Sequence, residues 1–208
     1  MEYWREIDLW KDVSLSDWTN WKWQLKNSIR STQKLKEVLG DISNINISDP
    51  EILSDVTNTF EMKLTPYIVT VVYDAIRKGN LKTANIISNI FIPSIYEIAN
   101  VNNGIDGIGE ESDIVKPAPL ITNFYKNRVL FFVTNMCSAY CRYCFRRRKV
   151  GSHKKEKEEE MGLNSELIQQ SIQYIRNNKE IKEVIVSGGD PFVLSDEKLL
   201  SILRELKA

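Results

Sequence analysis

The sequence has little glycine, proline or histidine, and it carries no excess of either charge. Nine glycines and six prolines among 208 residues, of which 42% are hydrophobic, exclude a disordered low-complexity chain and a collagen-like one. The 28 basic and 28 acidic side chains cancel, which argues against a general polyanion-binding protein. The composition therefore indicates a globular protein in which any basic patch is local.

Long apolar runs are also missing. No uninterrupted hydrophobic stretch approaches the ~18 residues of a membrane span, and the acidic N-terminus has no apolar segment typical of a secretory signal. We therefore expect a cytoplasmic protein with no membrane partner. At about 150 residues per domain, the length allows one domain and part of another.

Two residue types are clustered. All five tryptophans lie within the first 23 residues, and the spacing of Trp18, Trp21, Leu25 and Ile29 predicts an amphipathic helix from Ser16. We expect these tryptophans to pack in a core or between domains. All three cysteines lie within eight residues of one another, and their odd number argues against a self-contained disulfide framework.

The region before residue 120 is expected to be helical. The apolar run from Leu64 to Ile76 fits either a helix or a strand, and a helix beginning near Pro66 is favoured because proline suits a first helical turn. Residues 84–99 predict another helix, interrupted or bent at Pro93. Residues 102–119 are rich in glycine, proline and asparagine and predict a connector. We therefore expect residues 1–120 to form a helical region that ends in this connector.

Residues 121–208 show a different pattern. Val129–Val133 and Val184–Val186 predict two buried strands. Helices are expected from Asn164 and from Ser195. A strand, helix, strand, helix order predicts a parallel βαβ unit with a right-handed crossover, so the fold class is α/β. Polar motifs follow both strands, at the end where such units carry their function.

The cysteines have the chemistry of a metal site. Cys137, Cys141 and Cys144 are spaced so that three soft thiolates can converge, and such ligands select iron–sulfur clusters, zinc or copper. A structural zinc site needs four ligands, and the sequence has no fourth cysteine and a single histidine, His153. A 4Fe–4S cluster held by three cysteines would leave one iron open. A zinc knuckle that binds RNA is a remote alternative.

The Cys-x3-Cys-x2-Cys spacing, with Tyr143 before the third cysteine, resembles the signature of radical S-adenosylmethionine (SAM) enzymes. Residues 131–148 and 184–197 together resemble the aminomutases of that family, most of all lysine 2,3-aminomutase, and similar stretches upstream extend the resemblance over essentially the whole chain. It implies that residues 121–208 begin a TIM-like radical SAM barrel, which they leave incomplete. Family members are roughly twice as long, so the lysine that would form the Schiff base is expected beyond Ala208.

The resemblance also implies cofactor sites. Cys137, Cys141 and Cys144 would ligate three irons of a 4Fe–4S cluster, and SAM would chelate the fourth. The residues expected to bind SAM are Tyr143, Ser187, Gly188, Gly189 and Asp190. An electron from a donor such as flavodoxin or ferredoxin would then cleave SAM to a 5'-deoxyadenosyl radical.

Further positions match the family's substrate and pyridoxal phosphate sites. Arg146 would clamp the substrate's α-carboxylate, and the alternatives for the basic run 146–149 are a solvated surface or a nucleic-acid contact, the latter disfavoured by the zero net charge. Tyr125 and Arg128 would bind pyridoxal 5'-phosphate. Phe124 stands where lysine enzymes carry another arginine. Together with Phe145 and Pro191, this departure resembles a wider branch that includes enzymes that β-lysylate an elongation factor.

The expected function is an isomerase reaction. The amino group of L-lysine would move from Cα to Cβ through a 5'-deoxyadenosyl radical and a pyridoxal phosphate imine. The alternatives are a glutamate 2,3-aminomutase, an elongation-factor β-lysylation enzyme, or an inactive truncated protein that binds a cluster. The full-length enzyme is expected to be a homo-oligomer that acts on a small amino acid and binds no nucleic acid. Whether the reading frame continues past Ala208 would decide between lysine and the other substrates.

Overall fold

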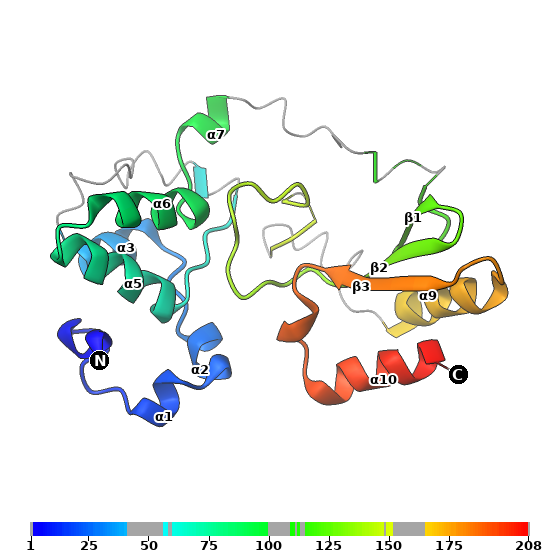
Figure 1. Ribbon diagram of the computed structural model, residues 1–208, viewed down its shortest axis with the longest axis horizontal. Coiled ribbons are helices and arrows are strands. Elements are labelled where there is room, and N and C mark those ends of the chain that lie inside the picture. Colours follow the sequence, from blue (N-terminus) through cyan, green and yellow to red (C-terminus); the bar gives the residue numbers. More distant parts are fainter. Residues whose placement is uncertain are drawn as a thin grey trace. The chain divides into compact units, whose positions relative to one another are not determined.

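The computed structural model describes residues 2–40, 56–57, 60–99, 109–110, 112, 115–147, 149–151 and 165–207. The chain divides into two compact units. The N-terminal unit comprises Met1–Val101 together with Ser138–Cys144, and the C-terminal unit comprises Asn102–Cys137 together with Phe145–Ala208. Most of the expected connector, as well as His153, lies outside the described residues. The expected α/β class is confirmed, with helices in the first unit and a small sheet in the second (Figure 1).

The N-terminal unit begins with short helices: η1 (Tyr3–Glu6), α1 (Leu15–Trp18), α2 (Trp21–Lys26) and α3 (Thr32–Leu39). The single helix predicted from Ser16 to Ile29 is wrong. The chain breaks at Asn20, whose backbone is extended and whose side chain accepts a hydrogen bond from Lys22 N at 2.9 Å, so a second helix starts there. Ile29 lies beyond α2 and pairs with Leu64 in an isolated bridge.

The later helices of this unit are α5 (Pro66–Arg77), α6 (Leu81–Phe91) and α7 (Tyr96–Ala99). The favoured helix at Pro66 is confirmed, and the Thr65 side chain caps it by accepting from Ile68 N. The helix predicted over residues 84–99 begins earlier, at Leu81, behind an Asn80 cap. It is interrupted rather than bent, because a proline two residues after its end cannot continue the helical hydrogen bonding.

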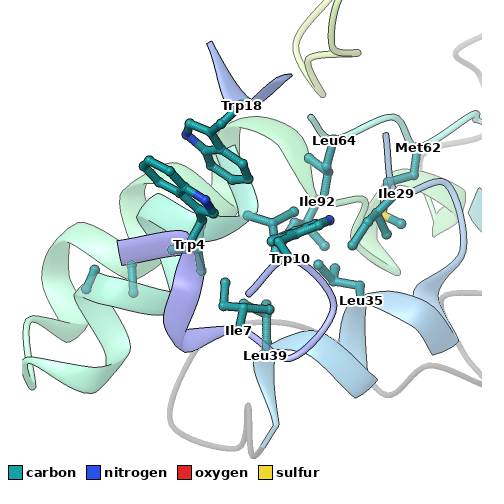
Figure 2. Close-up of a cluster of buried hydrophobic side chains, with 14 residues drawn as sticks. Trp4, Ile7, Trp10, Trp18, Ile29, Leu35, Leu39, Met62, Leu64 and Ile92 are labelled. Atoms are coloured by element: carbon teal, nitrogen blue, oxygen red, sulfur yellow. The ribbon is translucent and has the colours of Figure 1, made fainter. Parts of the chain in front are cut away.

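The core of the N-terminal unit is built around tryptophan (Figure 2). Trp4 stacks on Trp18 with ring centroids 4.7 Å apart, and Trp10 packs at 5.8 Å from Trp18. All three side chains are buried, so the expectation that they form a core is confirmed for them. Trp23 is partly buried against the same core. Trp21, at the start of α2, is 45% exposed and is not part of this core, so for it packing between domains stays a prediction.

The C-terminal unit is a three-stranded sheet in the order β1 (Ile121–Tyr125), β2 (Arg128–Thr134), β3 (Glu183–Gly188). β2 and β3 are parallel and are joined through α9 (Ser165–Asn177), which confirms the predicted βαβ unit. After β3 come η3 (Pro191–Val193) and α10 (Asp196–Lys207). The core places fully buried β2 side chains against both helices; its members include Val129, Phe131, Val133, Ile172 and Ile202.

The hairpin of β1 and β2 was not predicted. The two strands pair antiparallel, with Thr122 opposite Leu130 and Tyr125 opposite Arg128. β1 is buried at its start and exposed at its end instead of alternating, so it lacks the period of two that indicates a half-buried strand. The main residue that β1 contributes to the core of this unit is Ile121.

Candidate cofactor site

The site is formed where the two parallel strands end. β2 runs through Thr134 into the cysteine loop, and β3 runs into Gly188, Gly189 and Asp190. Two backbone hydrogen bonds join these segments: Gly189 N donates to Thr134 O at 2.6 Å, and Asp190 N donates to Met136 O at 2.7 Å. The Gly-Gly-Asp turn is therefore fixed to the chain that leads directly into Cys137.

Both glycines are required by this close approach. Gly188 has a φ of +134°, and a Cβ there would lie 2.2 Å from Thr134 O. A Cβ on Gly189 would lie 2.2 Å from Met136 O and 3.0 Å from Cys137 Sγ. Any side chain at these positions would push the two strand ends apart. The Gly-Gly pair thus brings the turn into contact with the first cysteine.

Asp190 and Ser187 have partners within the C-terminal unit. Asp190 Oδ1 accepts from Phe192 N at 3.0 Å and so caps η3. Ser187 Oγ accepts from Arg146 Nη1 at 3.1 Å. A hydroxyl side chain at the end of β3 and an acidic side chain in the turn that follows therefore offer oxygen acceptors, which suit an ammonium group.

Arg146 forms a buried ion pair with Glu110. Its Nε donates to both carboxylate oxygens of Glu110 at 3.0 and 3.1 Å, and its Nη2 donates to Oε1 at 2.6 Å. Lys149 Nζ lies 3.4 Å from the same carboxylate. Glu110 is only 3% exposed. Arg146 and Lys149 are thus held by a buried carboxylate, which disfavours both the solvated surface and the nucleic-acid contact.

Glu110 was missed by the sequence reasoning. It lies within the expected connector, where acidic residues are ordinary and no periodic pattern marks one of them. The Arg146 guanidinium, predicted to hold a substrate carboxylate, contacts the Glu110 carboxylate and Ser187 in this structure. The geometry of this pair shows that Arg146 can bind a carboxylate in the bidentate mode.

The cysteine loop is divided between the two units. Cys137 belongs to the C-terminal unit, and Cys141 and Cys144 belong to the N-terminal unit, as does Tyr143. All three cysteines are partly buried and none forms a disulfide. Tyr143 is 73% exposed. Among the residues that the structure describes, no three His, Cys, Asp or Glu side chains form a ready metal site. The donor set of three partly accessible thiols nevertheless has the chemistry that an iron–sulfur cluster needs.

The residues expected to bind pyridoxal phosphate lie together at the β1–β2 hairpin. The Cζ atom of Arg128 is 5.9 Å from the Tyr125 ring centroid. The Arg128 guanidinium also donates to Glu183 Oε2 at 2.7 Å. Phe124 and Tyr125 are both exposed. The hairpin therefore places the Arg128 guanidinium beside the exposed Tyr125 ring.

Residues 131–207 match the family model described as the radical SAM superfamily. This range includes the second half of β2, the cysteine loop, and helices α9 and α10. The L-lysine 2,3-aminomutase of Bacillus subtilis (strain 168) is 33% identical over 99% of this chain and 40% of its own length. The expected resemblance to the radical SAM aminomutases is confirmed.

Two further aminomutases are similar to this chain. The L-lysine 2,3-aminomutase of Clostridium subterminale is 32% identical over 98% of this chain and 45% of its own length. The glutamate 2,3-aminomutase of Clostridioides difficile (strain 630) is 34% identical over 92% of the chain and 41% of its own length. The chain thus spans less than half the length of these curated relatives. The radical SAM match implies a 4Fe–4S cluster and SAM.

Proposed function

We propose that this chain is the N-terminal portion of a radical SAM aminomutase, an isomerase that moves the amino group of L-lysine from Cα to Cβ. One structural observation supports this proposal above the others. The Gly188-Gly189-Asp190 turn is hydrogen-bonded to the backbone that enters the cysteine loop, and Gly189 lies against Cys137. A ligand of Cys137 would therefore lie beside the polar turn after β3.

In this proposal Cys137, Cys141 and Cys144 hold three irons of a 4Fe–4S cluster. When bound, the cluster supplies the single electron that cleaves SAM. The chain's own residues orient SAM: the glycine turn permits close backbone approach, and Asp190 with Ser187 offers oxygen acceptors to its amino group. Tyr143 is proposed to pack on the adenine, which suits its exposed ring.

Arg146 is proposed to bind the substrate's carboxylate. Its guanidinium is already fixed in a bidentate geometry by Glu110, and Ser187 accepts from its other arm. Fixing the guanidinium reduces the entropy that would be lost when a second carboxylate binds. Tyr125 and Arg128 are proposed to contact pyridoxal phosphate, supported by their close placement on the hairpin.

A glutamate substrate is the second candidate. The similarity to the Clostridioides difficile glutamate enzyme is as high as that to the lysine enzymes. The carboxylate-binding role of Arg146 is the same for either amino acid, as it is for an elongation-factor lysine acceptor. Supplying the protein that contains this chain with lysine or glutamate, under reducing anaerobic conditions, would separate these substrates by the β-amino acid formed.

Anaerobic reconstitution tests the cluster. We expect about four irons per chain and a cluster spectrum that changes when SAM is added. The matched control is the Cys137→Ala, Cys141→Ala, Cys144→Ala variant, which removes every thiol of the chain. If that variant takes up as much iron as the wild-type chain, the proposed cluster site is wrong. Zinc in place of iron would favour the zinc-knuckle alternative, and a cluster without turnover in the complete protein would favour an inactive cluster-binding protein.

Several expectations remain predictions. The flavodoxin or ferredoxin donor, the homo-oligomer and the cytoplasmic location are among them. Within the described part of the chain, no helix has both the length and the apolar character needed to cross a membrane.

A further inference from the structure

The middle of the cysteine loop is bound to the helices of the N-terminal unit. Tyr140 N donates to Lys63 O at 3.3 Å, and Arg142 N donates to Ile90 O at 2.8 Å. The Tyr140 side chain is 9% exposed, and the Lys63 ammonium lies 5.6 Å from its ring centroid. The segment Ser138–Cys144 therefore belongs to the N-terminal unit, whereas the strand β2 that precedes it belongs to the C-terminal unit.

Arg142 makes several side-chain contacts in this docked segment. Its Nε donates to Glu97 Oε1 at 2.5 Å, and its Nη1 donates to Asn89 O at 3.2 Å and to Asn89 Oδ1 at 3.4 Å. The side chains of Arg142 and Glu97 are 21% and 11% exposed. Glu97 is itself oriented by a hydrogen bond from Ser94 N at 2.8 Å. Arg142 thus clamps the loop to the end of α6 and the start of α7.

We propose that Arg142 is a positioning residue that holds Cys141 and Cys144 in place for an iron–sulfur cluster. This inference rests on the proposed function, because it requires that the cysteines bind a cluster. Arg142 directly follows Cys141 and lies two residues before Cys144. Its backbone and side chain together fix the chain between these two ligands, while Cys137 is fixed separately by the turn after β3.

The physical basis is the cost of loop disorder. A loop tied at several points loses little further entropy when its thiolates bind metal. Without the Arg142 side chain, the loop keeps its backbone bonds at Tyr140 and at position 142 but loses three side-chain bonds, and the Glu97 carboxylate remains largely buried without this partner. Residues that orient metal ligands typically change metal affinity by about 10–100-fold when replaced.

The test compares iron retention among variants of the reconstituted chain. Arg142→Ala is expected to release iron to a chelator about tenfold faster than the wild-type chain. Arg142→Lys, which keeps the charge but not the planar fork, should fall between the two. Arg77→Ala is the matched control, because Arg77 is also an ion-paired arginine of the N-terminal unit, bound to Glu6 and Asp74, and it should release iron at the wild-type rate.

A second control separates positioning from general stability. Val72→Ala removes a buried core side chain of the same unit, and its urea midpoint can be compared with that of Arg142→Ala. The positioning role is overturned if Arg142→Ala retains iron like the wild type, or if Val72→Ala releases iron as fast at an equal loss of stability. A wild-type chain whose iron uptake equals that of the triple-cysteine variant overturns the proposed function as well, so the two failures are distinguishable.

Discussion

The two units of this protein are stabilised in different ways and contribute differently to the site. The N-terminal unit builds its core from indole rings of its first 18 residues and from aliphatic side chains that extend as far as Ile92. The C-terminal unit buries the strand β2, which lies between β1 and β3 in the sheet and packs in one core with α9 and α10. Polar motifs of the proposed site follow the strands of the second unit, yet two of the three cysteines pack with the first. The comparison shows that part of a loop that follows a strand can belong to a helical unit distant in sequence.

The largest expected effect tests whether the two cores unfold separately. Phe131→Ala empties a fully buried position of the C-terminal core and should lower the free energy of unfolding by about 3–5 kcal/mol. Because all five tryptophans lie in residues 4–23, tryptophan fluorescence follows the N-terminal unit, whereas far-UV circular dichroism follows both. We expect the dichroism transition to move much more than the fluorescence transition.

The reciprocal variant completes this test. Leu35→Ala, in the N-terminal core, should move the fluorescence transition, with a loss of about 2–5 kcal/mol. If both variants shift the fluorescence and dichroism transitions equally, the two cores unfold as one cooperative structure. That result would contradict separate unfolding of the two units.

The second prediction concerns the buried ion pair of the C-terminal unit. Glu110→Gln removes the charge that holds Arg146 and Lys149 and should cost about 1.5–3 kcal/mol, as for hydrogen bonds to charged groups. Glu183→Gln removes the exposed partner of Arg128 in the same unit and should cost at most about 1 kcal/mol. Urea unfolding followed by circular dichroism measures both. Equal costs would mean that burial does not distinguish the two pairs.

The third prediction probes the contact between the strand ends. Gly189→Ala should destabilise the C-terminal unit by about 1–3 kcal/mol, because the added Cβ overlaps Met136 O. The control is Gly79→Ala in the N-terminal unit, where a positive φ of 69° is strained but no atom lies within 4 Å of the added group. That variant should cost about 1 kcal/mol. A Gly189→Ala protein as stable as the wild type would contradict the close approach of the turn.

The smallest effect is a pH-dependent one within α5. A hydrogen bond from Lys78 lowers the pKa of Asp74, and the charge of Lys78 adds to this, against partial desolvation. The stabilisation is therefore present above the ordinary aspartate pKa of 3.8 and is lost as the pH falls through the lower folded-state value. Asp74→Asn should be slightly less stable than the wild type at neutral pH and equal to it in strong acid. The urea midpoints of the two proteins, followed by tryptophan fluorescence, measure this difference in stability. If the variant is still less stable than the wild type in strong acid, the effect comes from packing and not from the charge of Asp74.

The sequence predicted the elements whose signals are local. The parallel βαβ unit followed from two apolar runs separated by a helical period, and the helix at Pro66 followed from its position in a first turn. The strand-end placement of the cysteine loop and the Gly-Gly-Asp turn followed from the same order of elements. In each case a few neighbouring residues carry enough information to specify the backbone.

The failures come from competing local bonds and from distant contacts. Asn20 interrupts the helix that the regular apolar spacing predicts. Its side chain accepts a hydrogen bond from the backbone N–H of Lys22, and this local bond competes with a continuous helix. Glu110 finds Arg146 across 36 residues, and Glu97 finds Arg142 across 45. A single sequence gives no local signal for such pairs. They become visible only when the fold within each unit brings the two partners together.

The docking of residues 138–144 has a consequence for the order of folding. During synthesis the helices that receive this segment leave the ribosome first, and domains generally fold as they emerge. The receiving surface, with Lys63 O and Ile90 O as acceptors, would then exist before the cysteines are made. The contacts of Arg142 join residues 45 and 53 positions apart, and such non-local contacts form late and slowly. Docking of the cysteine loop would then be among the last steps by which the polypeptide reaches its native state, after its helical receptor has already formed.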